Sequence, residues 1–114
     1  MSILVTGAAG FIGAYVTRAL LARGYRVVGL DNFNAYYDPR LKRDRVAALC
    51  PQADVRVLDL TDRDGLARLF DAAAPTSVVH LAAQAGVRHS LENPHAYVDA
   101  NLAGFVNVLE LCRH

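Results

Sequence analysis

The sequence predicts an α/β protein: a half-sized three-layer domain with a four-stranded parallel sheet in the order 3-2-1-4 and two helices on each face. Short apolar segments rich in β-branched residues alternate with segments whose apolar residues recur at helical spacing. Such alternation is typical of parallel strands joined by right-handed crossovers. The 114 residues, 54% hydrophobic and 20% charged, are sufficient to bury the core of one such domain.

The first strand–helix–strand unit occupies the first 31 residues. Residues 2–5 are a short apolar run that ends at a group of glycines. Beyond the glycines, the apolar residues share one face of a helix at positions 12, 15, 16, 19 and 20. Gly24 stands where a helix commonly ends in a left-handed residue. Residues 25–31 then form the second strand, which closes on an acid.

The alternation continues through the rest of the chain. Proline and capping residues mark where the helices begin, and Asp59 closes the third strand as Asp31 closes the second. A charged helix over 39–49 and a strand over 54–60 are expected first. A helix capped by Thr61 follows, with Leu66, Leu69 and Phe70 on one face, and then a strand over 76–83. The final helix begins at Pro94, and its apolar residues form one stripe: Val98, Leu102, Phe105, Val106 and Leu109. The fourth strand is then an edge without a neighbour.

Three glycines, Gly7, Gly10 and Gly13, separate the first strand from the first helix. A helix that begins there presents unpaired N–H groups and the positive end of its dipole, which together suit a pyrophosphate. Gly7 permits the tight turn, Gly10 leaves room for the phosphates, and Gly13 lets the helix pack close to the sheet. The spacing differs from the common G-x-G-x-x-G fingerprint, and a turn that binds no ligand is the alternative.

Asp31, at the end of the second strand, is the expected cofactor selector. A carboxylate there accepts ribose hydroxyls and repels a 2′-phosphate, which favours NAD over NADP; a surface acid is the alternative. The nearby basic residues Arg40, Lys42, Arg43 and Arg45 are interpreted as the solvated face of a helix rather than a 2′-phosphate site. Asp59 either meets the adenine amino group or is another surface acid.

Several functional classes are disfavoured by composition. A net charge of +1 gives no electrostatic case for nucleic acid or an anionic membrane. The apolar runs are too short to span a bilayer and no secretory signal precedes the first strand, so we expect a cytoplasmic protein. The two cysteines form no C-x-x-C pattern and the histidines, at 80, 89, 95 and 114, show no metal-binding spacing, so no metal site is expected.

These segments resemble the extended short-chain dehydrogenase/reductases, and within them the NAD-dependent sugar-nucleotide epimerases and dehydratases. The resemblance covers the whole chain and implies a Rossmann-type dinucleotide-binding fold. It is carried by "VTGAAGFIG", the "DN" after the second strand, "LDL", "VVHLAAQAGV" and "NLAGFVNVLE". Two loops, at 31–45 and 84–104, are more similar to UDP-glucuronate 4-epimerases than to UDP-glucose 4-epimerases or dTDP-glucose dehydratases.

The resemblance implies roles for individual residues. The expected NAD-binding residues are Gly7, Gly10, Phe11, Ile12, Gly13, Asp31, Asn32, Asn34, Asp59, Leu60, Leu81, Ala82, Ala83, Gln84 and Asn101. The expected substrate-facing residues are Gly86, Val87, Arg88 and Ser90. The Arg88 guanidinium suits a uronate or a diphosphate, although a loop arginine in solvent is the alternative. His80 is expected to be a core or cofactor-wall histidine rather than a catalytic base.

The family's catalytic Tyr-x-x-x-Lys pair is not present. None of the five tyrosines, at 15, 25, 36, 37 and 97, has a lysine four positions later. The resemblance therefore implies a truncated NAD-binding domain over 1–114, without the catalytic and sugar-nucleotide parts, and we expect no epimerisation and at most weak NAD binding. A stand-alone nucleotide-binding module and a fragment that binds nothing are the alternatives.

The edge strand also suggests association between chains. Val78, Val79 and Leu81 would lie on an edge whose backbone groups are unpaired, and such edges recruit partner strands. Relatives are expected to dimerise through the last helix, and Gly104 within it permits close approach of another backbone or of the sheet. We expect a homodimer through the edge or the last helix.

Overall fold

The computed structural model describes residues 2–33, 39–82 and 91–113. Its sheet has four parallel strands in the order β3-β2-β1-β4, as the sequence predicts. The strands are β1 (Ser2–Thr6), β2 (Arg26–Asp31), β3 (Asp54–Val57) and β4 (Ser77–His80). The helices are α1 (Phe11–Ala22), α2 (Pro39–Leu49), α3 (Arg63–Ala73), α5 (Pro94–Val98) and α6 (Gly104–Arg113), with a π-helical segment η1 (Asp99–Ala103) between the last two.

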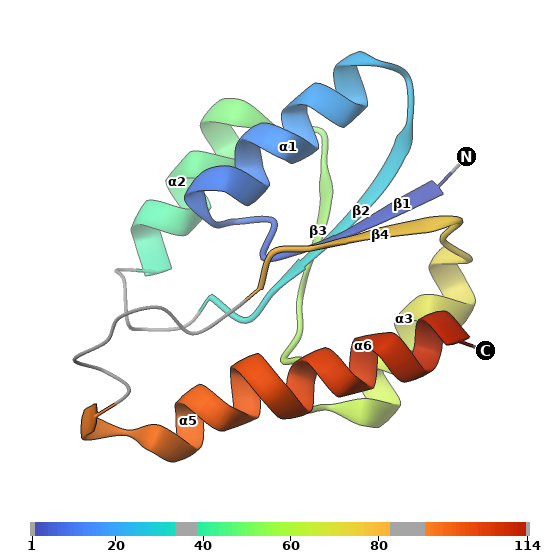
Figure 1. Ribbon diagram of the computed structural model, residues 1–114. Coiled ribbons are helices and arrows are strands. Elements are labelled where there is room, and N and C mark those ends of the chain that lie inside the picture. Colours follow the sequence, from blue (N-terminus) through green and yellow to red (C-terminus); the bar gives the residue numbers. More distant parts are fainter. Residues whose placement is uncertain (1, 34–38, 83–90, 114) are drawn as a thin grey trace.

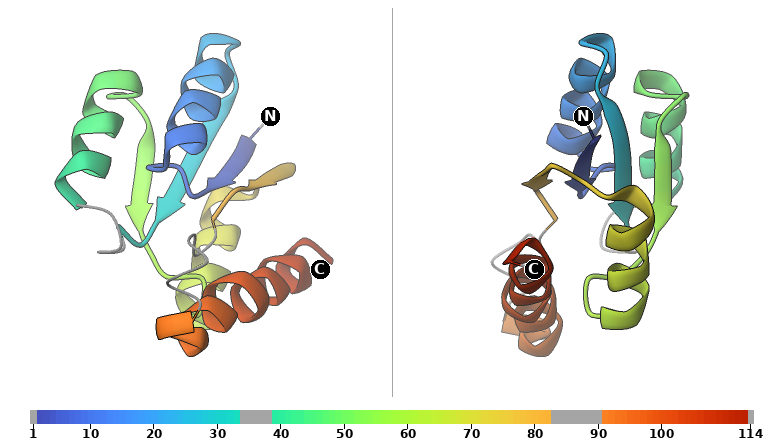
Figure 2. Two further views of the ribbon diagram at one scale, coloured as in Figure 1. Left: turned by 60° about the vertical axis from the view of Figure 1, so that its left-hand side comes forward. Right: turned by 90° about the vertical axis from the view of Figure 1, so that its right-hand side faces the viewer.

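The helices form two layers around the sheet. Helices α1 and α2 lie side by side on one face, and α3 and α6 lie side by side on the other (Figure 1 and Figure 2). The order of the strands explains this division, because right-handed crossovers that move outward in opposite directions from β1 place their helices on opposite faces. The carboxyl ends of all four strands consequently meet at one edge of the sheet.

The central strand supplies both halves of the core. Every residue of β1 is buried, and alternate side chains point to opposite faces. Ile3 and Val5 pack with Ala8 and Val27 on the side of α1. Leu4 belongs to a larger cluster on the side of α3 and α6, which comprises Leu4, Val28, Leu30, Leu60, Leu66, Leu69, Ala73 and Val108. Burial on both faces explains why these strands read as continuous apolar runs.

Several element ends differ from the sequence prediction. Strand β3 ends at Val57 and β4 at His80, three residues earlier than expected in each case. The helix after β3 is capped by Asp62, whose carboxylate accepts from the Gly65 N–H at 3.0 Å. Thr61 is not the cap, because its hydroxyl donates to the Asp59 carboxylate at 2.7 Å.

The last helix departs further from the prediction, because its expected apolar stripe faces outward. Val98, Leu102, Phe105, Val106 and Leu109 are all exposed, and the buried positions of α6 are Gly104 and Val108. Gly104 allows this packing, since a Cβ there would lie 2.9 Å from the Leu60 Cβ. The helix therefore approaches the sheet through its smallest residue, and Leu102, Val106 and Leu109 are left exposed.

Helix α1 shows the same inversion at its amino end. Gly13, Ala14 and Thr17 are its buried residues, whereas Ile12 and Tyr15 of the predicted stripe are exposed.

Within the part of the chain that the structure describes, no helix combines the length and apolarity needed to cross a bilayer.

Candidate dinucleotide-binding site

The expected site lies where the carboxyl ends of β1, β2 and β4 meet the start of α1. The turn after β1 is held by backbone hydrogen bonds: the N–H groups of Gly7 and Ala8 both donate to the Leu30 carbonyl, at 2.9 and 3.2 Å. Gly7 adopts a φ of 71°, which favours glycine. A Cβ on Gly7 would also lie 2.8 Å from the Ala82 N, so the chain segments leaving β1 and β4 touch at this point.

Gly13 is required for a reason more local than the sequence suggests. A Cβ at Gly13 would lie 1.9 Å from the Gly7 carbonyl oxygen, so the close approach is to the turn itself rather than to a strand. Gly10 is the N-cap of α1 and offers no side chain to the first turn. A Cβ at Gly10 would lie 3.2 Å from the same oxygen, a tight contact that a small shift relieves.

The amino end of α1 is open. Its first helical hydrogen bond runs from the Ala14 N–H to the Gly10 carbonyl at 2.9 Å. Among the described residues, the N–H groups of Phe11, Ile12 and Gly13 have no hydrogen-bond partner. These donors and the helix dipole make the end of α1 suited to an anion.

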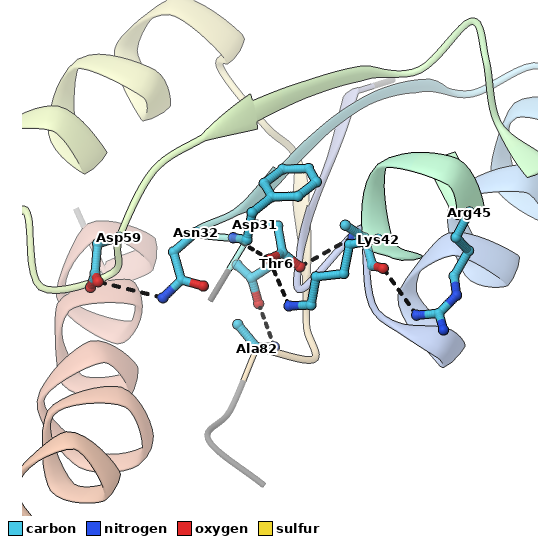
Figure 3. Close-up of polar contacts among 9 residues, drawn as sticks. Thr6, Asp31, Asn32, Lys42, Arg45, Asp59 and Ala82 are labelled. Carbon is cyan, nitrogen blue, oxygen red and sulfur yellow. Dashed lines mark hydrogen bonds and ion pairs between the residues drawn. The ribbon is translucent and has the colours of Figure 1, made fainter. Parts of the chain in front are cut away.

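Asp31 lies beside this open end and is only 4% exposed. Its Oδ2 accepts from the Ala9 N–H at 3.2 Å, and its Oδ1 accepts from the Phe33 N–H at 2.8 Å and from the Lys42 Nζ at 3.0 Å (Figure 3). A carboxylate offers about four acceptor positions, so these three donors leave about one position.

The interpretation of the basic cluster as a solvated face is wrong for two of its members. The Lys42 side chain is 14% exposed and forms an ion pair with Asp31. The Arg45 Nη1 donates to the Ala9 carbonyl at 3.1 Å, and its guanidinium lies 5.9 Å from the centre of the Phe11 ring. Lys42 and Arg45 are three residues apart, a spacing that puts two side chains on one helix face and could have identified them.

A second polar group lies at the end of β3. The Asp59 Oδ1 accepts from the N–H and the hydroxyl of Thr61, at 2.9 and 2.7 Å, and the Asn32 Nδ2 donates to its Oδ2 at 3.5 Å (Figure 3). Burial alone would raise the pKa of Asp59, but the hydrogen bonds from Thr61 and Asn32 together hold that pKa below its usual value. The next residue, Leu60, is buried, and its carbonyl accepts from the Asn107 Nδ2 at 2.8 Å.

The third component is the junction between β1 and β4. The Thr6 Oγ1 accepts from the Leu81 N–H at 3.0 Å and from the Ala82 N–H at 3.1 Å, and it lies 2.7 Å from the His80 Nδ1. The His80 ring stacks on Phe105 of α6 with centroids 5.2 Å apart. Burial lowers the pKa of His80. No role is predicted for Thr6 from the sequence. The one feature of the sequence that could have identified it is its position, as a polar residue at the end of an apolar strand.

The structure brings together the expected residues of the glycine turn, the ends of β2 and β3, and the start of the chain after β4. Asn101 lies in the π-helical segment η1. Seven expected residues lie outside the described residues: Asn34, Ala83, Gln84, Gly86, Val87, Arg88 and Ser90. In the described ranges, no group of three or more histidine, cysteine, aspartate or glutamate side chains could hold a metal ion.

The arrangement is similar to that of known proteins. The family model described as GDP-mannose 4,6 dehydratase matches residues 4–114. The UDP-glucuronate 4-epimerase 1 of Arabidopsis thaliana is 58% identical over 114 residues, which are 99% of this chain and 27% of the plant protein. The 37.6 kDa protein in the cld 5′ region of Escherichia coli O111:H- is 50% identical over 115 residues, covering 100% of this chain and 34% of that protein.

Solved structures agree in fold. The UDP-glucuronic acid 4-epimerase from Bacillus cereus, in complex with UDP-glucuronic acid and NAD, has a TM-score of 0.87 and 37% identity over 100% of this chain and 37% of that one. The UDP-glucose 4-epimerase of Thermus thermophilus, in complex with NAD, has a TM-score of 0.85 and 42% identity over 99% of this chain and 34% of that one. The chain thus spans between 25% and 34% of the length of the curated relatives it matches.

Proposed function

The chain belongs to the family of NAD-dependent sugar-nucleotide epimerases and dehydratases, and from this premise we propose that it is the N-terminal, NAD-binding part of a UDP-glucuronate 4-epimerase. The observation that carries the proposal is the open amino end of α1 beside the buried Asp31. Free N–H donors, a positive dipole and a nearby ribose acceptor are the three features that a bound dinucleotide requires there.

The residues of the turn fit the pyrophosphate of NAD. The N–H groups of Phe11, Ile12 and Gly13 are available as donors among the described residues. Gly10 carries no side chain that would keep the phosphates from these donors. Phe11 and Ile12 have exposed side chains that could cover the cofactor from one side.

The adenosine half fits the ends of β2 and β3. Asp31 retains about one acceptor position for a ribose hydroxyl, and Asn32 lies next to it. Asp59 and the buried Leu60 border the space expected for adenine. Because the Asp31 carboxylate opposes a 2′-phosphate, we propose NAD rather than NADP as the cofactor, although Lys42 offsets part of that charge.

The nicotinamide and sugar halves are proposed from the resemblance. Leu81, Ala82, Ala83, Gln84 and Asn101 would line the cofactor toward the nicotinamide, and Gly86, Val87, Arg88 and Ser90 would face the sugar nucleotide. Bound NAD supplies reversible hydride transfer at the sugar C4. In the family this step also needs a Tyr-x-x-x-Lys pair, and no tyrosine of this sequence has a lysine four positions later. We therefore propose that these 114 residues bind the cofactor and do not epimerise by themselves.

The exposed stripe of the last helix supports a proposed dimer. Val98, Leu102, Val106 and Leu109 have exposed apolar side chains, and Phe105, which stacks on His80, is also 42% exposed. Contiguous apolar surface of this kind typically marks an interface. We propose that two chains associate through this stripe.

The proposed cofactor is tested by calorimetric titration of NAD. We expect weak binding, with a dissociation constant of about 1 mM, equivalent to about −4 kcal/mol. A Gly10→Ala variant should lose the binding, because the added methyl group occupies the approach to the free N–H groups. Gly24→Ala adds the same methyl group two residues beyond the opposite end of α1, where a Cβ would meet nothing within 4 Å. Because the φ of 85° at Gly24 strains an alanine, the melting temperature of this control is measured to establish that it is folded during the titration.

The outcomes separate the alternatives. Binding by the parent chain and the control, but not by Gly10→Ala, supports the proposed site. Heat of binding that is equal in all three proteins would place NAD elsewhere. No heat and no melting shift at about tenfold higher NAD would contradict the proposal and leave a fold that binds no dinucleotide.

A further inference from the structure

The hydroxyl of Thr6 has a complete set of partners, and this fixes the state of His80. Thr6 is fully buried. Its oxygen accepts two N–H groups, from Leu81 at 3.0 Å and from Ala82 at 3.1 Å. A hydroxyl has two acceptor lone pairs and one hydrogen to donate. With both lone pairs in use, the hydrogen of Thr6 is directed to the His80 Nδ1, which lies 2.7 Å away.

The His80 Nδ1 must therefore act as an acceptor. An imidazole accepts at Nδ1 only when it is neutral and carries its proton on Nε2. Burial lowers the pKa of His80, which agrees with a neutral ring.

The two N–H groups held by Thr6 lie at the centre of the candidate site. The Ala82 N and the Leu81 carbonyl carbon would lie 2.8 and 2.9 Å from a Cβ on Gly7. Thr6 therefore holds the segment that leaves β4 directly against the glycine turn. The Leu81 N–H also donates to the Thr6 carbonyl at 3.2 Å, so it shares its hydrogen between two atoms of one residue.

We propose that His80 is a positioning residue for the dinucleotide site: by accepting the Thr6 hydroxyl hydrogen, its neutral Nε2–H form leaves Thr6 free to hold Leu81 and Ala82 against the glycine turn. The inference rests on the proposed function, which it deepens. His80 touches neither cofactor nor substrate in this role, because it acts through Thr6 and the backbone of the next two residues.

Protonation of His80 would disturb this arrangement. The imidazolium carries a hydrogen on Nδ1, so Thr6 would face three donors with two lone pairs, and its own hydrogen would lose its acceptor. One of the two hydrogen bonds that the Thr6 Oγ1 accepts, from the Leu81 N–H or from the Ala82 N–H, must then lengthen or break. The segment after β4 would separate from Gly7, and the turn would lose the neighbour that limits its movement.

The charged groups on the elements that contact His80 do not oppose the protonation of its ring. His80 contacts β1 through Thr6 and α6 through Phe105. Neither β1 nor β4 contains another titratable side chain within its described residues. On α6 the titratable residues are Glu110, Cys112 and Arg113, and the Arg113 Nη2 and Glu110 Oε2 pair with each other at 2.8 Å. Asp99 of η1 is exposed.

The first test needs no ligand. Nitrogen NMR of the labelled 114-residue chain reports the tautomer of His80, and hydrogen exchange reports the Leu81 and Ala82 N–H groups. We expect the Nε2–H form at about pH 8. Because burial lowers the pKa of His80 below the usual value of about 6.5, the acid condition, near pH 5, is one at which the same spectra show a protonated ring. There we expect about tenfold less protection of one or both N–H groups, once intrinsic exchange is corrected. The Nδ1–H form at about pH 8 would overturn the inference.

Two variants separate positioning from packing. His80→Asn keeps an acceptor oxygen near the place of Nδ1 but cannot titrate, so protection should be high at both pH values. His80→Leu keeps an apolar volume without the acceptor, so protection should be low at both. Should His80→Leu fail to fold, His80→Asn still decides: an acid-induced loss of protection in His80→Asn equal to that of the parent chain would overturn the inference.

The second test measures NAD binding at the same two pH values. The dissociation constant of the parent chain should rise by about tenfold or more at about pH 5, whereas that of His80→Asn should change by less than about threefold. Equal acid sensitivity in both proteins would overturn the role in binding. If neither protein binds NAD at either pH, the proposed function fails, and the ligand-free test still decides whether His80 controls the Leu81–Ala82 segment.

Discussion

Helices α3 and α6 lie side by side on the same face of the sheet (Figure 2). The two helices differ in how far their large apolar residues are buried. Leu66 and Leu69 of α3 are buried in the main core. Phe105, Val106 and Leu109 of α6 are exposed, and α6 packs toward the sheet through its buried Gly104 and Val108 and the partly buried Leu111. The same helical periodicity therefore marks a core-facing stripe in α3 and an outward-facing stripe in α6, which fits a surface that another chain covers.

The largest expected effect compares one leucine from each helix. Leu66→Ala removes a side chain that is 0% exposed, and we expect the free energy of unfolding to fall by about 3 kcal/mol. Leu109→Ala is the matched substitution on α6, where the side chain is 50% exposed, and we expect a loss below about 0.5 kcal/mol in the monomer. Urea unfolding at low protein concentration measures both. Similar losses of unfolding free energy in the two variants would show that Leu66 and Leu109 contribute equally to the core.

The close contact of α6 gives the next effect. Gly104→Ala should destabilise the fold by about 1–2 kcal/mol, because the new Cβ would lie 2.9 Å from the Leu60 Cβ. The direction of the change in unfolding free energy is informative, because alanine has a better helix propensity than glycine by about 1 kcal/mol and would stabilise a helix at an uncrowded position. Urea unfolding again provides the measurement, and a stabilised variant would show that α6 does not pack as closely as described.

The outward stripe predicts association rather than monomer stability. In a Leu102→Lys, Leu109→Lys double variant, we expect the free energy of unfolding of the monomer to change by less than about 0.5 kcal/mol. Light scattering at high concentration should report a dimer for the parent chain and a monomer for the variant. A monomeric parent chain at high concentration would contradict the proposed dimer.

The smallest effect concerns acid stability at the turn between β3 and α3, which also supports α6 through Leu60 and Asn107. Hydrogen bonds lower the pKa of Asp59 in the folded state, so its contribution is present above the unfolded pKa of about 3.9 and is lost as the pH falls through the folded value. Because Asp59 is exposed, we expect no more than about 0.5 kcal/mol. Asp59→Asn should remove this part of the pH dependence between about pH 5 and pH 2. An unchanged profile would show that the turn contributes nothing.

The sequence predicted the sheet order, the glycine turn and the placement of Asp31 at its edge, because each depends on local patterns: alternation, glycine spacing and a strand that ends in an acid. It did not predict which face of α6 would be buried, since periodicity reveals a stripe but not the neighbour that covers it. The inward orientation of Lys42 and the partners of Thr6 also escaped prediction. Both depend on contacts between residues distant in the sequence.

We propose that the open amino end of α1 receives the pyrophosphate of NAD. Amide NMR of the nitrogen-labelled chain during a titration with NAD measures this binding at each N–H group. The N–H signals of Phe11, Ile12 and Gly13 should shift furthest and saturate together with those of Asn32. Saturable shifts confined to other parts of the chain, or no shift at several millimolar NAD, where a site with a dissociation constant of about 1 mM would be largely occupied, would contradict it.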